Sequence, residues 1–196
     1  MGKTSHTDPR ERMIQSAVAL FRERGVDGTS FADVLAHSQA PRGSLYHYFP
    51  GGKAQLAEEA TRYAGEVIAG GLAAALAQKD PVAAIRAFAA LWRDVLRSSD
   101  FASGCPIVAA TLEGERAPAV RDAAGAAFQR LEELLAGGFE QQGVAPQRAR
   151  SLATLAIASI EGAIVLSRAQ RDSAPLERVA GELETLVAGA IAGPGD

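Results

Sequence analysis

Apolar residues recur every three or four positions along most of the chain, which is the spacing of amphipathic helices. For example, Phe31, Val34 and Leu35 share one face of a short segment that follows a natural N-cap. No stretch alternates with a period of two over a useful length, so we predict no β-structure. The pattern predicts an all-α protein of about nine helices in two lobes. The expected helices cover residues 9–24, 31–38, 41–48, 53–77, 81–98, 105–112, 119–141, 146–170 and 176–192.

The expected helix from Pro41 to Tyr48 has few apolar anchors, and only Leu45 and Phe49 are expected to point inward. Its two tyrosines, histidine and arginine would be exposed over two helical turns. Such a helix suits the major groove of DNA, where its side chains meet base edges. The predicted base contacts are Arg42, Gly43, Ser44, Tyr46 and His47.

These residues are expected to act in different ways. Arg42 would pair with guanine, because arginine commonly donates to O6 and N7 of that base. Gly43 would let the helix approach the groove without a side chain in the way. For Tyr46, packing against the first helix is an open alternative.

A second set of residues is predicted to contact phosphates: Thr29, Ser30, Tyr48 and Lys53. Lys53 follows two glycines at the start of a long helix, where backbone N–H groups also attract anions. The alternative roles are an ordinary solvated lysine and a packed tyrosine. Thr29 and Ser30 can also act as helix caps, and capping does not exclude a phosphate contact.

The stretch SFADVLAHSQAPRGSLYHYFPGGK, residues 30–53, resembles the helix-turn-helix of TetR-family transcriptional regulators, and specifically the LmrA/YxaF-like branch. The motif likeness covers residues 8–60, and the step Gly104-Cys105-Pro106 also looks like that branch. One departure is Gln39, which stands in the turn where the family usually has glycine, so the turn geometry carries some strain.

The resemblance implies an N-terminal three-helix helix-turn-helix DNA-binding domain, residues 1–52, and a larger C-terminal helical domain for effector binding and dimerisation, residues 53–196. It implies a ligand-responsive repressor that binds a palindromic double-stranded DNA operator as a homodimer and is released by a small-molecule effector. Two alternatives stay open: a helical enzyme or redox sensor that uses Cys105, and an architectural DNA-binding protein without an effector.

The charge distribution supports this division. The net charge is −3, which alone argues against nucleic-acid binding. Residues 1–53, however, carry seven Lys or Arg against five acidic residues, whereas residues 54–196 carry 13 against 18. A mildly basic end on an acidic body is typical of a DNA reader with a separate second domain.

Composition favours a cytoplasmic protein. Its 47% apolar content is ample for a core, and the single cysteine fits a reducing compartment. Neither a signal peptide nor an apolar run of about 18 residues is apparent, so no membrane partner is expected. We predict no cofactor, no metal site and no catalytic residue.

Bulky side chains of the larger lobe predict an effector pocket, with ordinary core packing as the alternative. The predicted lining residues are Phe88, Trp92, Phe101, Cys105, Ile107, Thr111 and Phe128. Cys105 could be a reactive thiol at a helix start or a small packed residue. The chain has no histidine beyond His47 that could activate it.

The last two helices carry small apolar stripes that predict a dimer interface, because small residues permit close approach across a two-fold axis. The alternative is burial within one subunit. The predicted interface residues are Leu152, Ala156, Ile160, Ala163, Leu183 and Val187.

Overall fold

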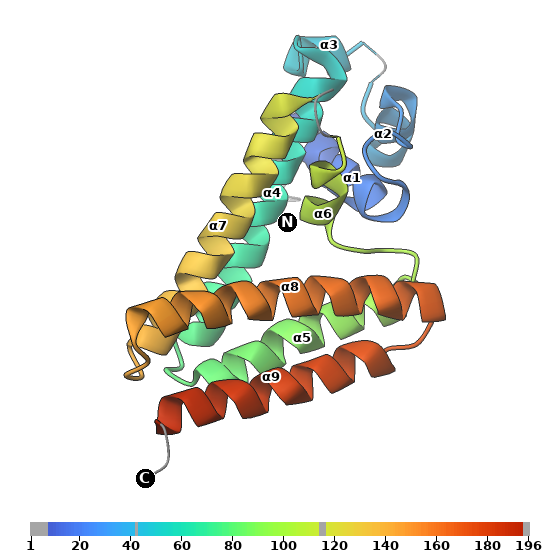
Figure 1. The fold of residues 1–196 in the computed structure, drawn as a ribbon. Helices are drawn as coiled ribbons and strands as arrows, with labels where there is room; N and C mark the ends of the chain where they lie inside the picture. The colour runs from blue at the N-terminus through green and yellow to red at the C-terminus, as the bar shows by residue number, and fades with distance from the viewer. Residues whose placement is uncertain (1–7, 42, 114–116, 194–196) are drawn as a thin grey trace, which may run out of the picture. The chain divides into compact units, whose positions relative to one another are not determined.

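The computed structural model describes residues 8–41, 43–113 and 117–193, which form nine α-helices and no strand (Figure 1). The predicted all-α fold is therefore confirmed. The helices are α1 (Pro9–Arg24), α2 (Phe31–Ser38), α3 (Leu45–Tyr48), α4 (Gly52–Leu76), α5 (Pro81–Ser98), α6 (Pro106–Thr111), α7 (Pro118–Glu140), α8 (Pro146–Gln170) and α9 (Ala174–Ala192).

The chain divides into two compact units whose limits differ from the predicted domains. Unit 1 comprises Met1–Ala64 and Pro106–Ala124, and unit 2 comprises Gly65–Cys105 and Gly125–Asp196. Helix α6 thus belongs to the same unit as the helix-turn-helix, although it lies far along the chain. The functional domain border between residues 52 and 53 stays a prediction.

Local caps define the first helices of unit 1. The Asp8 side chain accepts a hydrogen bond from the Arg10 N–H at 3.1 Å, and α1 ends at Gly25, whose φ is 77°. Ser30 and Asp33 form a reciprocal capping box at the start of α2. Helices α1 and α2 pack together, and a hydrogen bond of 2.9 Å joins His37 Nδ1 to Ser16 Oγ between them.

The third helix is shorter than predicted. Helix α3 begins at Leu45, whereas Pro41 and Ser44 belong to the turn that precedes it. The Ser44 N–H and hydroxyl both donate to the Pro41 carbonyl, at 3.0 and 2.6 Å. A serine hydroxyl that bonds the backbone locally competes with helix formation, which explains the late start. Phe49 is fully buried, as expected.

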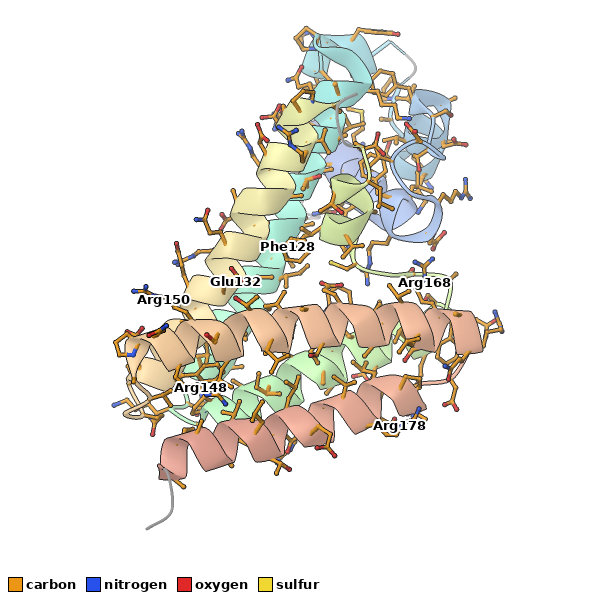
Figure 2. The ribbon with its side chains drawn as sticks, in the orientation of Figure 1. Phe128, Glu132, Arg148, Arg150, Arg168 and Arg178 are labelled. Atoms are coloured by element: carbon orange, nitrogen blue, oxygen red, sulfur yellow. The ribbon has the colours of Figure 1, made fainter. Side chains whose placement is uncertain are left out.

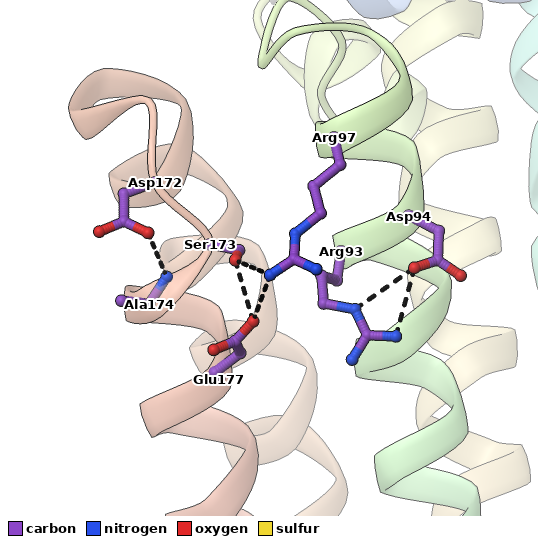
Figure 3. Close-up of polar contacts among 7 residues, drawn as sticks. All are labelled: Arg93, Asp94, Arg97, Asp172, Ser173, Ala174 and Glu177. Atoms are coloured by element: carbon purple, nitrogen blue, oxygen red, sulfur yellow. Dashed lines mark hydrogen bonds and ion pairs between the residues drawn. The ribbon is translucent and has the colours of Figure 1, made fainter.

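Unit 2 is built around α5, α8 and α9, which pack against one another. Polar contacts reinforce the contact of α5 with α9 (Figure 3). Arg97 of α5 donates to Ser173 Oγ at 2.8 Å and to Glu177 at 2.9 Å, and Ser173 also donates to Glu177. The start of α9 is thereby fixed to the end of α5.

Two glycines in unit 2 allow close contact between α4 and α7. A Cβ atom at Gly65 would lie 2.8 Å from Ala127 Cβ, and one at Gly138 would lie 2.7 Å from Leu76 Cδ2. Both contacts pair residues that are eleven apart on each helix, so the two helices run in the same direction. Side chains at these glycines would force the helices apart.

Candidate DNA-binding interface and effector site

Two of the four predicted phosphate contacts, Thr29 and Ser30, lie at the start of α2 and differ in exposure. Ser30 is exposed, and its hydroxyl donates to Asp33 Oδ2 while accepting from the Asp33 N–H. These bonds from Ser30 lower the pKa of Asp33 and so keep that carboxylate charged. Thr29 is only 1% exposed, and its hydroxyl donates to the Gly25 carbonyl at 2.9 Å. A phosphate cannot reach Thr29 unless the turn rearranges.

The surface of α3 agrees with a groove-reading role. Tyr46 is 70% exposed and His47 is also exposed. The Tyr46 ring meets Phe31 of α2 edge-on at 5.9 Å, while most of the Tyr46 side chain stays exposed. Tyr48 is half-buried, with its ring 5.0 Å from that of His47.

Two further predicted base contacts, Arg42 and Gly43, precede Ser44 and α3 in the sequence. Gly43 is exposed, and a Cβ atom there would meet nothing within 4 Å. Packing within the chain therefore does not require glycine at this position. Arg42, the predicted guanine contact, lies outside the described residues.

Lys53, in the first turn of α4, is half-buried and is held by the turn between α1 and α2. Its Nζ donates to the Asp27 carbonyl at 3.3 Å. The carboxyl group of Glu113, just after α6, contacts both the side chain and the backbone N–H of Asp27. Burial, and then the charge of Asp27, raise the pKa of Glu113, whereas the charge of Lys53 opposes this shift. Sequence reasoning missed Glu113, because 86 positions separate it from Asp27.

The predicted effector-pocket residues are divided between the two units. Phe88 and Trp92 of α5 are buried with their rings edge-on, 6.2 Å apart. Phe101, Cys105 and Phe128 belong to the same unit. Cys105 is buried there, whereas Phe101 and Phe128 are half-buried. The remaining two, Ile107 and Thr111, belong to α6 in unit 1, where Ile107 is buried and Thr111 is exposed.

A polar cluster in unit 2 was not anticipated from the sequence. The Cys105 thiol donates to the Glu161 carboxylate, while burial raises the pKa of Glu161 to about 7. Arg168 lies two turns further along α8 (Figure 2). It donates to the Ala102 carbonyl at 2.8 Å, and its Nη1 would lie 2.7 Å from a Cβ at Gly104. The segment 102–105 thus lies along one face of α8.

Three buried atoms of α8 have no hydrogen-bond partner in the described part of the chain. They are Glu161 Oε2, Ser167 Oγ and Arg168 Nε. Buried polar atoms are usually paired, and a bound molecule is one way to pair them. No group of three or more His, Cys, Asp or Glu among the described residues could hold a metal ion.

All six predicted dimer-interface residues are buried within the single chain, which leaves their side chains little surface for a partner. The stripe of small residues on α8 instead packs against α5 and α9, which is the alternative of burial within one subunit. The exposed apolar residues of α8 are others, among them Leu155, Val165 and Leu166, which are 46%, 55% and 50% exposed.

A groove of about 540 Å³ runs beside this exposed face, between α8 and α9. It is lined by Leu155, Ser159, Arg178, Val179, Glu182, Leu183 and Leu186.

Helix α8 is also the one described helix long and apolar enough to span a membrane, but core helices of soluble proteins pass the same test, and 44% of its most apolar stretch is buried.

Known proteins match both parts of the chain. The family "Bacterial regulatory proteins, tetR family" matches residues 13–60, and "Transcriptional regulator LmrA/YxaF-like, C-terminal domain" matches residues 81–182. An uncharacterised HTH-type transcriptional regulator of Mycobacterium tuberculosis is 45% identical over 185 residues, covering 91% of this chain and 94% of the relative. The HTH-type transcriptional regulator LmrA of Bacillus subtilis is 33% identical and covers 88% of this chain and 93% of its own.

A solved structure shares the fold at comparable identity. The TetR transcriptional regulator of Chloroflexus aurantiacus superposes with a TM-score of 0.75 at 31% identity, covering 92% of this chain and 94% of that one. Fold, helix-turn-helix and relatives together define an all-helical DNA-binding transcriptional regulator. The chain belongs to the TetR family, in its LmrA/YxaF-like branch.

Proposed function

We propose that this chain is a repressor that binds a palindromic operator as a homodimer and leaves it when a small molecule binds unit 2. The observation that carries the DNA-reading part is the surface of Gly43, Tyr46 and His47. Tyr46 and His47 are exposed, and Gly43 is a glycine that packing within the chain does not require. A missing side chain is useful there if a DNA groove approaches the backbone closely.

The proposed base contacts are Arg42, Gly43, Ser44, Tyr46 and His47, and the proposed phosphate contacts are Ser30, Tyr48 and Lys53. Thr29 would support the start of α2 through its internal bonds rather than touch a phosphate. Each phosphate that Lys53 neutralises releases counterions, so this contact adds affinity without sequence preference.

The proposed dimer forms through the groove between α8 and α9 and the exposed apolar face of α8. Arg178 and Glu182 lie one helical turn apart on α9, at the groove. Under a two-fold axis the same patch meets itself, so the arginine of one copy can face the glutamate of the other. Leu155 and Leu166 would supply the apolar contact.

The proposed effector site lies in unit 2 near the unpaired atoms of α8. A ligand with a hydroxyl or amine group can donate to Glu161 Oε2, and an acceptor on it can take the Arg168 Nε proton. Pairing these atoms would favour the ligand-bound conformation, and differential binding of this kind is what shifts a regulator between two states.

Operator binding tests the proposal. Genomic fragments retained by the purified protein would be sequenced, and the affinity for the enriched site compared with that for a scrambled duplex. We expect Tyr46→Ala to reduce the preference for the operator. Lys53→Ala should weaken binding to both duplexes and lower the salt slope by about one unit, as for one lost phosphate contact. Equal affinity of the wild-type chain for both duplexes would overturn the proposal.

Sedimentation tests the dimer. Leu166→Glu would place a charge in the proposed apolar contact, so we expect monomers and a loss of operator affinity. Gln147→Glu adds the same charge to exposed α8 surface near its first turn, away from the groove residues, and should leave the dimer intact. A Leu166→Glu variant that remains dimeric would move the interface elsewhere.

A further inference from the structure

Three segments of unit 1 meet at Asp27, in the turn between α1 and α2. The Asp27 carbonyl accepts a hydrogen bond from Lys53 Nζ at 3.3 Å, at the start of α4. Its N–H donates to the Glu113 carboxyl group, which follows the end of α6. The backbone carbonyl and the backbone N–H of Asp27 are therefore both hydrogen-bonded. Lys53, a proposed phosphate contact, binds the carbonyl, and Glu113, just after α6, binds the N–H.

Glu113 is well placed to transmit the position of α6. Its own N–H donates to the Ala110 carbonyl at 3.4 Å, so the residue closes the last turn of the helix. Helix α6 packs on α1 in the same unit. A displacement of the end of α6 would pull directly on the turn that carries Asp27 and precedes Ser30.

The side chains of Glu113 and Asp27 are two carboxyl groups in contact, and a hydrogen bond between them requires one proton. The charged groups that act on Glu113 among the described residues are Asp27, from the α1–α2 turn, and Lys53, from α4. With the shared proton, the three groups together are neutral. Without it they carry one negative charge beside the place where a phosphate would bind.

We propose that Glu113 is a positioning residue for DNA binding, which clips the α1–α2 turn and Lys53 in place through Asp27 while the two carboxyl groups share a proton. The inference rests on the proposed phosphate contact of Lys53 and names a control on it. Loss of the proton breaks the bond between the two carboxyl groups, leaves only the Asp27 N–H bond to Glu113, and adds a charge that repels DNA.

The sign of the pH dependence follows from linkage. A nearby phosphate disfavours the charged carboxylate, so the DNA-bound protein holds the proton more tightly than the free protein. Operator affinity should therefore fall as the pH rises through the pKa of Glu113. The steepest possible change is about tenfold per pH unit for each linked proton.

Two substitutions of Glu113 separate the effect of its proton from the effect of its side-chain contacts with Asp27. In Glu113→Gln the amide can donate to the Asp27 carboxylate and accept from the Asp27 N–H at any pH, as the protonated acid does. We expect the advantage of this variant over the wild-type chain to grow as the pH rises through the pKa of Glu113, and to be several-fold at pH 8. Glu113→Ala loses the clip and should bind more weakly than Glu113→Gln at both pH values.

The measurement is operator affinity from pH 5 to 8 at constant ionic strength, with the thermal midpoint of each variant recorded at each pH. Glu23→Gln is the matched control, because it removes an exposed acid from α1 and should keep the wild-type pH profile. Parallel profiles for Glu113→Gln and the wild-type chain would overturn the inference. Failure of the wild-type chain to prefer its operator would instead overturn the proposed function.

Discussion

Unit 1 and unit 2 treat their polar side chains differently. In unit 1 the hydroxyl groups of Thr29, Ser30 and Ser44 bond to groups three or four residues away. In unit 2, Glu161 Oε2, Ser167 Oγ and Arg168 Nε are buried on one helix and lack a partner among the described residues. These hydroxyl groups of unit 1 already have partners within the chain, whereas unit 2 holds buried polar atoms that a bound molecule could pair.

The difference bears on where function can be changed without harm to the fold. A surface built on local caps keeps its shape when an exposed residue is replaced. A buried side chain that several helices share cannot be replaced without a cost in stability. Substitutions in unit 1 should therefore alter DNA binding more than folding, and the reverse should hold for the core of unit 2.

The largest expected effect comes from the paired variants Trp92→Ala and Tyr46→Ala. Trp92 is 2% exposed, and its removal should lower the free energy of unfolding by about 3–5 kcal/mol. The exposed Tyr46 should cost no more than about 0.5 kcal/mol, with a loss of operator preference. Urea unfolding and operator titration of both variants provide the measurements. Similar unfolding midpoints for the two would contradict the contrast between the units.

Glu161 gives the next largest effect, with a defined pH window. Burial raises its pKa from 4.5 to about 7, so the folded protein holds a proton that the unfolded chain has already released. The wild-type chain therefore loses stability as the pH rises from about 4.5 to about 7, and the loss is complete above that range.

Glu161→Gln removes this titration. At pH 8 we expect the variant to be more stable than the wild-type chain by about 2–3 kcal/mol, with no such difference at pH 4. Glu66→Gln, an exposed acid of α4 in the same unit, is the control and should show no comparable change. Equal stabilities of Glu161→Gln and the wild-type chain at pH 8 would mean that the carboxylate is solvated.

Sequence reasoning succeeded where the physical cause is local. Ser30 as an N-cap and Gly25 as a helix stop each depend on a few neighbouring residues. Phe49 was recognised as an anchor because it is apolar among exposed residues. The helix-turn-helix and the all-helical fold could therefore be predicted from spacing and from one ordered motif.

Helical spacing does not tell which partner covers a helix face, and this limits what the sequence can predict for unit 2. The stripe containing Ala156 and Ile160 was assigned to a second subunit, but α5 and α9 of the same chain bury it. The contact of Glu161 with Cys105, like that of Glu113 with Asp27, joins segments far apart in sequence. A single sequence contains no signal for such pairs.

The smallest expected effect concerns Gln39, the residue that departs from the family pattern in the turn after α2. Its φ of 53° and ψ of 31° are left-handed, and its N–H bonds to carbonyls at the end of α2. A side chain in this conformation costs about 1 kcal/mol, which Gln39→Gly would relieve, although glycine also gives the unfolded chain more freedom. We expect a net gain in stability of about 0.5 kcal/mol and unchanged operator affinity. Thermal unfolding measures the first and duplex titration the second, and a clear loss of stability would show that the Gln39 side chain contributes more than its backbone costs.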